Sequence, residues 1–184
     1  MAATTQTRGT ANGAAEATVH HDPVHKVSYW FEREGANLWV HTTLEPGAHL
    51  PEHLHPTLEE RWETLEGAAR VRLDGKWRDL VPADGPVVVA PNMRHELKNE
   101  SGQPARMRTE VLPAGHLEEF LVESARAARE GLYNARNLPT SFKGALWIAE
   151  FAHRFRDETV MTSPPPAVQK VALPPLAKLA RRRR

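Results

Sequence analysis

The sequence contains no cysteine among its 184 residues. Disulfides, thiolate metal sites, iron–sulfur clusters and cysteine nucleophiles are therefore excluded. The chain also has no Gly-rich phosphate-binding loop and no recognisable nucleophile, so nucleotide chemistry and acyl transfer lack the residues that they need. Any metal site in this chain must use nitrogen and oxygen ligands.

Long apolar runs and strong charge of one sign are also missing. No stretch approaches the ~18 uninterrupted apolar residues that cross a bilayer, and the N-terminus does not resemble a secretory signal. Lys and Arg number 24 against 23 Asp and Glu, and the formal net charge is +1. The four arginines at 181–184 carry +4, so the rest of the chain sums to −3 and lacks a basic face for nucleic acid. We expect a cytoplasmic protein that binds neither nucleic acid nor a membrane.

The chain length suits one globular domain with appendages. Residues 1–22 offer almost nothing to bury, which predicts a flexible tail. Residues 23–113 consist of short alternating segments separated by Pro, Gly and Asp, the pattern of many brief strands. Within them Asp74-Gly75 predicts a two-residue hairpin loop. The predicted fold class of this region is mainly β.

In residues 114–184 the apolar period lengthens to three and four, which predicts a small α-helical extension. A first helix follows Gly115 and stops near Gly131, and a second covers the segment around residues 142–155. A Pro-rich linker is predicted at 164–175, with a short third helix within 171–180.

Four residues carry the candidate chemistry. His53 and His55 are one residue apart, so on a strand their imidazoles share a face at about 6–7 Å between Cα atoms. Glu60 adds a carboxylate and His95 a third imidazole from a later strand. Such a set suits Fe(II), Mn, Ni, Co, Cu or Zn and can leave two positions of an octahedron open. In a chain with ten histidines, a polar strand edge is the alternative.

The spacing of these residues resembles the first signature of the cupin superfamily. Its positions are filled by Gly47, His53, His55, Glu60 and Gly67, and residues 53–67 have the sequence HLHPTLEERWETLEG. The resemblance covers residues 35–113. It implies a jelly-roll β-barrel that usually dimerises, and metal ligands at His53, His55, Glu60 and His95.

The second cupin signature is matched less completely. His95 and Asn99 lie where it places a His and an Asn, whereas Asp84, Ala90 and Asn92 occupy its Gly, Pro and Gly positions. Asn is the residue other than Gly that best accepts a left-handed turn, so the departure at Asn92 is compatible with the loop.

Alternation along the strands predicts which side chains share the side of the ligands. The predicted substrate pocket consists of Trp62, Thr64, Leu97, Asn99 and Thr109. Core packing is the alternative for Trp62, and a turn or capping amide for Asn99.

Two further residues are candidates for moving protons. Glu59 competes with Glu60 for the ligand position, and His49 lies in the loop before the ligands. The remaining histidines are expected to have no role in the site. His20, His21 and His25 are predicted to be solvated beside the tail, His41 shares neither face nor spacing with the cluster, and His116 and His153 are predicted to be structural.

Cupins include dioxygenases, isomerases, epimerases, decarboxylases, cyclases and binders, so fold alone does not select a reaction. The first hypothesis is an oxidative, dioxygenase-like enzyme in which a divalent metal, Fe(II) before Mn, Ni, Zn, Co or Cu, holds a small chelating organic substrate and dioxygen. The second is a redox-neutral isomerase or cyclase in which Glu59, His49 or a water moves the proton. The third is a non-catalytic binder of small molecules.

The helical extension has apolar faces that must be buried somewhere. They can pack on the outer wall of the barrel, cover its mouth, or contact a second subunit. We expect a homodimer, with Phe142, Trp147, Phe151 and Phe155 at the contact.

Overall fold

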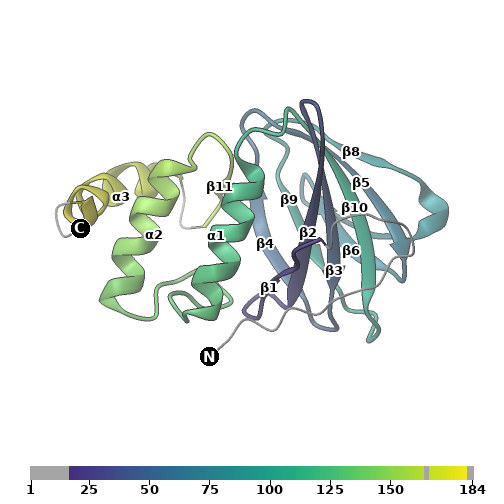
Figure 1. The fold of residues 1–184 in the computed structure, drawn as a ribbon, viewed down its shortest axis with the longest axis horizontal. Coiled ribbons are helices and arrows are strands. Elements are labelled where there is room, and N and C mark those ends of the chain that lie inside the picture. Colours follow the sequence, from purple (N-terminus) through teal and green to yellow (C-terminus); the bar gives the residue numbers. More distant parts are fainter. Residues whose placement is uncertain (1–16, 164–165, 182–184) are drawn as a thin grey trace.

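The computed structural model describes residues 17–163 and 166–181. These residues form a β-barrel of two antiparallel sheets with three α-helices beside it (Figure 1). The strands are β1 (His20–Asp22), β2 (Val27–Glu34), β3 (Asn37–Leu44), β4 (His49–Leu54), β5 (Glu59–Glu66), β6 (Ala69–Leu73), β7 (Lys76–Leu80), β8 (Val87–Val89), β9 (His95–Lys98), β10 (Ala105–Leu112) and β11 (Val160–Met161). The helices are the 3-10 helix η1 (Pro82–Asp84), α1 (Leu117–Arg129), α2 (Phe142–Arg154) and α3 (Pro166–Arg181).

The two sheets enclose a single apolar core. One sheet has the strand order β1-β2-β3-β10-β5-β8 and the other the order β11-β4-β9-β6-β7. Buried apolar residues of both sheets belong to one cluster, which includes Leu38, Leu44, Val71, Leu80, Val89 and Val111. The structure therefore confirms the predicted fold class, a mainly β jelly-roll barrel followed by a helical extension.

The predicted alternation and hairpin are present. Along β3 the buried residues are every second one, Leu38 to Leu44, and β10 has the same period of two. This pattern arises because one face of each strand packs into the barrel while the other meets water. Asp74 and Gly75 connect β6 to β7 with φ of 46° and 80°, the positive values that a two-residue hairpin loop requires.

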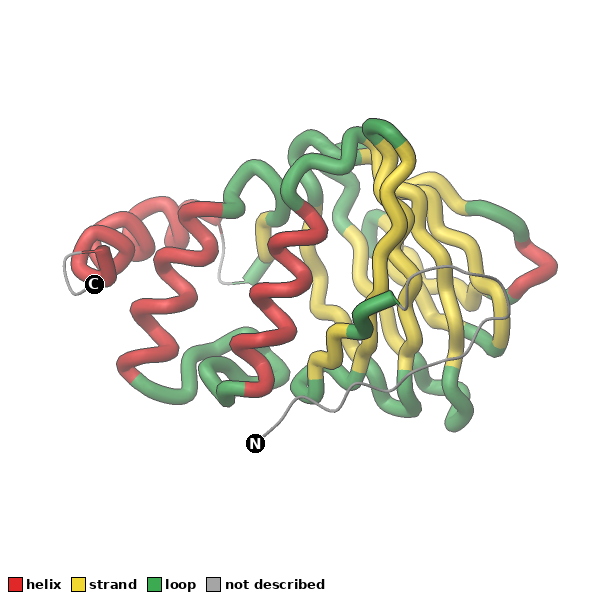
Figure 2. The backbone as a smooth tube through the Cα atoms, in the orientation of Figure 1, coloured by secondary structure: helices red, strands yellow, loops and turns green. Residues whose placement is uncertain are grey.

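The helices gather at one end of the molecule, away from η1 (Figure 2). Helix α1 lies nearest the barrel and contacts β1, while α2 and α3 contact each other (Figure 1). Helix α1 ends before Gly131, whose φ of 67° suits the stop predicted there.

Aromatic side chains join α1 to α2. Phe151 and Phe155 contact the Phe120 ring at centroid distances of 4.9 and 5.6 Å, and Trp147 stacks on Tyr133 at 5.8 Å. These three residues, which we expected at a subunit contact, therefore pack within the chain. Phe142 differs from them, since it is 57 % exposed.

The N-terminal boundary differs from the predicted one. Residues 17–22 belong to the described structure, and β1 pairs with β2. Asp22 is buried, and hydrogen bonds from the backbone N–H groups of Val24 and His25 compensate its carboxylate for the loss of water. The predicted flexible tail is thus wrong for residues 20–22, and residues 1–16 lie outside the described part.

The predicted linker at 164–175 is also wrong from residue 166 onward. Helix α3 begins at Pro166 and is longer than the predicted segment 171–180. Proline is tolerated at the first position of a helix because the N–H that it lacks has no partner there. Residues 164–165 lie outside the described part.

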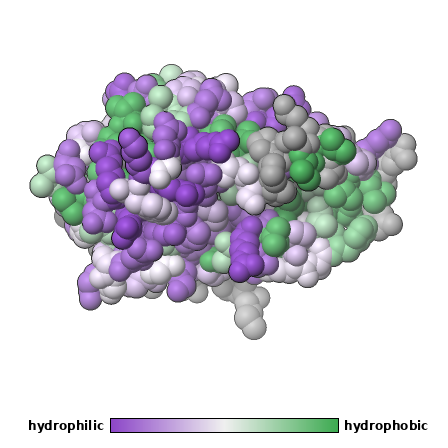
Figure 3. All heavy atoms as spheres, turned by 180° about the vertical axis from the view of Figure 1, so that it is seen from behind, coloured by the Kyte–Doolittle hydropathy of each residue, from purple (hydrophilic) through white to green (hydrophobic). Residues whose placement is uncertain are grey.

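The surface seen in Figure 3 is mainly hydrophilic over the barrel and more apolar toward the helical end. There α3 exposes Val168 and Val171. Within residues 17–163 and 166–181, no helix has the length and apolar character needed to cross a membrane.

Candidate metal centre

The four predicted ligands converge inside the barrel. His53 on β4 and His95 on β9 are register partners, His55 directly follows β4, and Glu60 belongs to β5. One ring nitrogen from each of the three histidines lies within 4.8 Å of the other two. The Oε2 atom of Glu60 lies 3.6 Å from Nε2 of both His55 and His95. Residues from three separate segments thus form one polar cluster.

Backbone carbonyls fix the tautomer of all three imidazoles. The Nδ1–H of His53 donates to the carbonyl of Pro51 at 2.8 Å. That of His55 donates to the carbonyl of Glu158 at 2.6 Å, and that of His95 to the carbonyl of Met93 at 2.9 Å. A carbonyl only accepts, so each Nδ1 carries the proton and each neutral ring keeps its lone pair on Nε2. Hydrogen bonding of the second ring nitrogen is how proteins orient histidine ligands of metals.

The Nε2 atoms of His53 and His95 lie 3.0 Å apart. A hydrogen bond between them would require one ring to be an imidazolium, because both Nδ1 atoms already hold a proton. Burial lowers the pKa of His53 to about 4, and burial followed by the charges of His53 and His55 lowers the pKa of His95 further. Burial also lowers the pKa of His55. The rings are therefore neutral at physiological pH, and their lone pairs face one another as they would around a cation.

Glu60 brings the negative charge to the cluster. Burial raises the pKa of its carboxyl, and the Nε1–H of Trp62 donates a 3.0 Å hydrogen bond to Oε2. A buried carboxylate is costly unless a cation or hydrogen bonds compensate it. Three imidazole nitrogens and one carboxylate fit a divalent transition metal.

The loop of the second signature supports this centre. Asn92 has φ of 65°, the left-handed conformation expected from the sequence, and its N–H donates to the carbonyl of His55 at 2.8 Å. The Asn in place of Gly therefore preserves the loop that adjoins the ligands.

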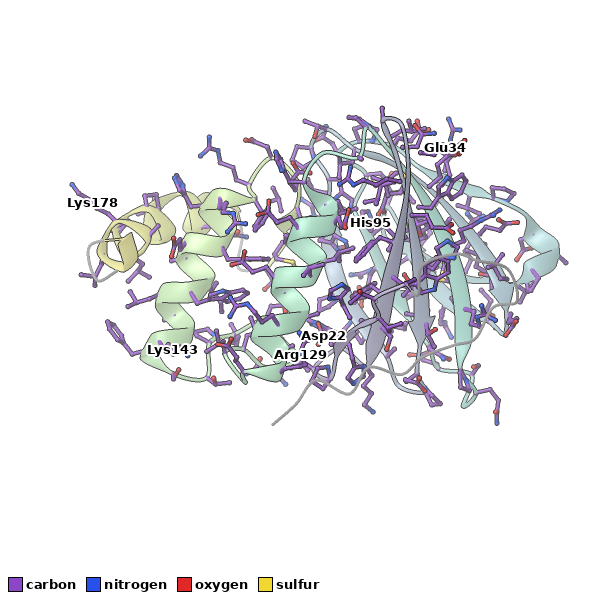
Figure 4. The ribbon with its side chains drawn as sticks, viewed as in Figure 1. Asp22, Glu34, His95, Arg129, Lys143 and Lys178 are labelled. Carbon is purple, nitrogen blue, oxygen red and sulfur yellow. The ribbon has the colours of Figure 1, made fainter. Side chains whose placement is uncertain are left out.

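The cluster opens on a cavity of about 680 Å³ between the barrel and the helices. Most of its wall is apolar and aromatic, with Tyr29, Leu50, Trp62, Leu97, Phe120 and Phe151 among the lining residues. Figure 4 shows His95 and Asp22 on the side of the barrel that faces α1. The helical extension therefore covers the mouth of the barrel, one of the three arrangements considered from the sequence.

The predicted pocket residues divide into two groups. Trp62, Leu97 and Thr109 line the cavity. Thr64 and Asn99 are buried elsewhere: the Thr64 hydroxyl donates to the carbonyl of Leu80, and the Asn99 amide donates to the carbonyls of Leu44 and Gln103. Asn99 therefore closes a turn, which was the alternative considered from the sequence.

The two proton-transfer candidates lie outside the cavity lining. Glu59 pairs with Arg61 at 3.0 Å, because alternation along β5 turns it away from Glu60. His49 pairs with Glu96 at 2.8 Å, and its side chain is 42 % exposed. Neither residue is placed to touch a molecule in the cavity, which corrects the expectation from the sequence.

Sequence reasoning missed a second polar group in the cavity wall. His25 was expected to be solvated, but its Nδ1 donates to Oδ2 of Asp22 at 2.8 Å, and both residues are buried. The Tyr133 hydroxyl donates to the same carboxylate oxygen at 3.0 Å. The signal in the sequence was Asp22-Pro23, since an Asp accepting the N–H groups two and three residues on forms an Asx turn. His153 on α2, predicted to be structural, also lines the cavity.

Comparisons with known proteins agree with this geometry. The family model of the cupin domain matches residues 40–112. The chain is 36% identical over 70 residues to polyketide synthase CurC of Streptomyces cyaneus, covering 38% of this chain and 45% of the relative. It is 30% identical over 94 residues to the tetracenomycin polyketide synthase protein TcmJ of Streptomyces glaucescens, covering 48% and 62%. The chain thus spans about half the length of these curated relatives.

A solved structure, KdgF from Halomonas sp., matches 50% of this chain and 84% of its own, with 17% identity and a TM-score of 0.45.

Proposed function

The barrel of this chain belongs to the cupin superfamily, and from this premise we propose that the chain is a metal-dependent enzyme with an oxidative, dioxygenase-like reaction on a small chelating organic molecule. The observation that carries the proposal is the convergence of three Nε2 lone pairs and the Glu60 carboxylate on one centre. Fe(II) is the proposed ion, and Mn, Ni, Zn, Co and Cu are the other ions that this donor set accepts.

A divalent ion at this centre would supply Lewis acidity toward a chelating pair of oxygens and, as Fe(II), electrons for dioxygen. The residues of the chain supply orientation and a dry environment. The carbonyls of Pro51, Glu158 and Met93 hold the imidazole rings, and Trp62 holds Glu60. The apolar wall excludes water from the substrate, which strengthens every polar contact within.

The cavity supports a conjugated, mostly apolar substrate. Aromatic rings of Trp62, Tyr29, Phe120 and Phe151 form much of its wall, and about 680 Å³ accommodates a molecule of several rings. The printed names of both curated relatives refer to polyketide synthases. Polyketides offer pairs of neighbouring enolic, phenolic and carbonyl oxygens, which chelate divalent metals. We propose a substrate of this chemical kind.

A redox-neutral cyclisation or isomerisation is the second candidate. The donor set is equally compatible with it, since the same nitrogen and oxygen ligands hold ions that do not change oxidation state. In this reaction the ion would only polarise a carbonyl or enol oxygen, so Zn would serve as well as Fe.

Metal binding is the first test. The purified chain, stripped with a chelator and dialysed against Fe(II), Ni or Zn, should retain about one equivalent by elemental analysis. Removing a residue that is hydrogen-bonded to a metal ligand lowers metal affinity by about 10–100-fold. His53→Gln and Glu60→Gln remove a ligand itself, so each should lower metal affinity by at least this factor. His41→Gln is the matched control, because His41 pairs with Glu32 outside the cavity lining. Absence of metal from the unaltered chain after dialysis contradicts the proposal.

Oxygen uptake then separates the two reactions. Iron-loaded protein is mixed with a panel of phenolic and enolic chelators in an oxygen electrode, and products are followed by mass spectrometry. Oxygen consumption that disappears in His53→Gln supports the oxidative reaction. Turnover without oxygen consumption, retained by zinc-loaded protein, supports cyclisation or isomerisation. Binding without turnover indicates a non-catalytic binder.

The homodimer and the cytoplasmic location stay predictions from the sequence. Light scattering of the full chain at two concentrations tests the homodimer.

A further inference from the structure

Asp22 and His25 form a buried pair in the wall of the cavity, apart from the four predicted metal ligands. Both residues line the cavity, and their exposed fractions are 2 % and 7 %. Nδ1 of His25 donates to Oδ2 of Asp22 at 2.8 Å, so the lone pair of the neutral ring lies on Nε2, the far edge.

Nε2 of His25 is buried and has no hydrogen-bond partner among the described residues. A buried polar atom without a partner destabilises the fold, because it has lost its hydrogen bonds to water without replacement. Such atoms in native structures call for an explanation, and a ligand in a cavity is one of them. The His25 ring lies beside the Tyr133 ring, with centroids 5.6 Å apart.

We propose that His25 is a catalytic residue: its Nε2 accepts the hydrogen bond, and then the proton, of a weakly acidic hydroxyl on the molecule held in the cavity. The hydroxyl belongs to a phenol or an enol, the chemical class that a chelating conjugated substrate presents. The inference rests on the proposed function only in placing that molecule in the cavity.

The proton transfer balances within the pair. The O–H bond of the hydroxyl breaks, its electron pair stays on the oxygen, and the proton moves to Nε2. The imidazolium that forms keeps its Nδ1–H bond to the Asp22 carboxylate, which offsets the new positive charge. No oxidant or further reactant is needed.

The surroundings keep Asp22 ionised, as this role requires. Burial alone would raise its pKa, but hydrogen bonds from His25 and from the Tyr133 hydroxyl hold the pKa below its ordinary value. Oδ1 accepts the backbone N–H groups of Val24 and His25 at 2.8 and 3.0 Å. Tyr133 in turn lies 3.0 Å from the Ser124 hydroxyl on α1, so the extension helps to hold the pair.

The test uses metal-free protein and 4-nitrophenol, an acid whose ionised form absorbs visible light and whose neutral form does not. At neutral pH, the ratio of ionised to neutral 4-nitrophenol should be about tenfold larger when the probe is bound to the unaltered chain than when it is bound to His25→Gln. A tenfold change in this ratio corresponds to a shift of about one unit in the pKa of the probe. Asp22→Asn should behave like His25→Gln. His41→Gln, which alters a histidine–carboxylate pair outside the cavity lining, should behave like the unaltered chain. Equal ratios in the unaltered chain and a folded His25→Gln overturn the inference.

A second measurement needs no variant. In the nitrogen-15 spectrum of histidine side chains, Nε2 of His25 should move toward the protonated position when 4-nitrophenol is added. An unmoved signal while the probe is bound overturns the inference.

Metal titration of the same variants separates the two proposals. His25→Gln should keep its metal affinity, because its side chain is not in the cluster of metal ligands. A chain that binds no metal yet ionises the probe through His25 contradicts the proposed function alone.

Discussion

Nδ1 of His55 donates a 2.6 Å hydrogen bond to the backbone carbonyl of Glu158, 103 residues further along the chain. The Thr159 hydroxyl lies 3.3 Å from the same nitrogen. Immediately after it, β11 pairs with β4, so that Met161 is the register partner of His53. The segment after α2 is therefore part of the candidate metal centre, because it orients one predicted ligand and pairs with the strand that carries another.

Trp62→Phe tests how the indole supports the centre. Phenylalanine retains an aromatic ring in the cavity wall but loses the Nε1–H that donates to Glu60. Loss of such a partner should weaken metal binding by about tenfold, with the protein still folded. Titration with Ni or Zn against a competing chelator measures it, and unchanged affinity in a folded variant contradicts this role.

Gly115→Ala tests the link to Glu158. Gly115 has φ of 51°, and a Cβ there would lie 2.5 Å from Oε2 of Glu158, whose side chain is buried. A left-handed alanine costs about 1–2 kcal/mol, and the displaced Glu158 should also disturb the carbonyl that holds His55. We expect lower stability and about tenfold weaker metal binding.

Gly131→Ala is the matched control for this change. Gly131 has φ of 67°, but a Cβ there would meet no described atom within 4 Å. It should lose stability by a similar amount and keep its metal affinity. Equal metal affinities in the two variants would count against the coupling between Glu158 and His55.

The stability of the metal-free protein should fall as the pH decreases from about 6.5 toward 4. A histidine in the unfolded chain titrates near 6.5, whereas the pKa of His53 in the folded chain is about 4, and those of His55 and His95 are also lowered. The unfolded chain therefore binds more protons in this window, and protonation favours unfolding.

Glu60 acts with the opposite sign. Its raised pKa makes ionisation costly in the folded chain, so protonation as the pH falls stabilises the fold. The three histidines should change the free energy of unfolding more than the one carboxyl does, so the net stability should fall as the pH decreases. Urea unfolding at pH 7 and pH 5 measures the difference, which should shrink in a double variant with His53→Gln and His95→Gln. A pH dependence that the double variant leaves unchanged would show that other groups cause it.

Asn99→Ala should destabilise the fold without affecting the metal. Asn99 is fully buried, its amide donates to the carbonyls of Leu44 and Gln103 at 2.8 and 2.7 Å, and its Oδ1 accepts the N–H of Ser101. Leaving these groups unpaired should cost about 2 kcal/mol or more. Urea unfolding checks the loss, and metal titration at low temperature checks the site. A large change in metal affinity would return Asn99 to the list of site residues.

The sequence contained enough to predict the barrel and the three histidines and one carboxylate that the structure brings together. Alternation in β3 and β10 and the positive φ that Asp74-Gly75 accepts are local properties, readable from a few neighbouring residues. His53, His55 and Glu60 lie within eight residues, and the resemblance of their spacing to the cupin signature favoured a metal site over a polar strand edge.

What the sequence did not reveal depends on long-range contacts. The acceptor for His55 is a backbone carbonyl, a group that every residue carries, so no side chain marks its position. The Asp22–His25 pair is completed by Tyr133, 111 residues beyond Asp22. Glu59 and His49 lie outside the cavity lining. Glu59 pairs with Arg61 on the same strand, and His49 pairs with Glu96 on the neighbouring strand.

The bond between His55 and Glu158 also bears on biosynthesis. A ribosome delivers the chain from its N-terminus, so all strands from β1 to β10 are made before residue 158. Until residue 158 is made, the Nδ1–H of His55 lacks the carbonyl of Glu158 as its acceptor. The final geometry of the candidate metal centre therefore cannot form until residue 158 has been synthesised.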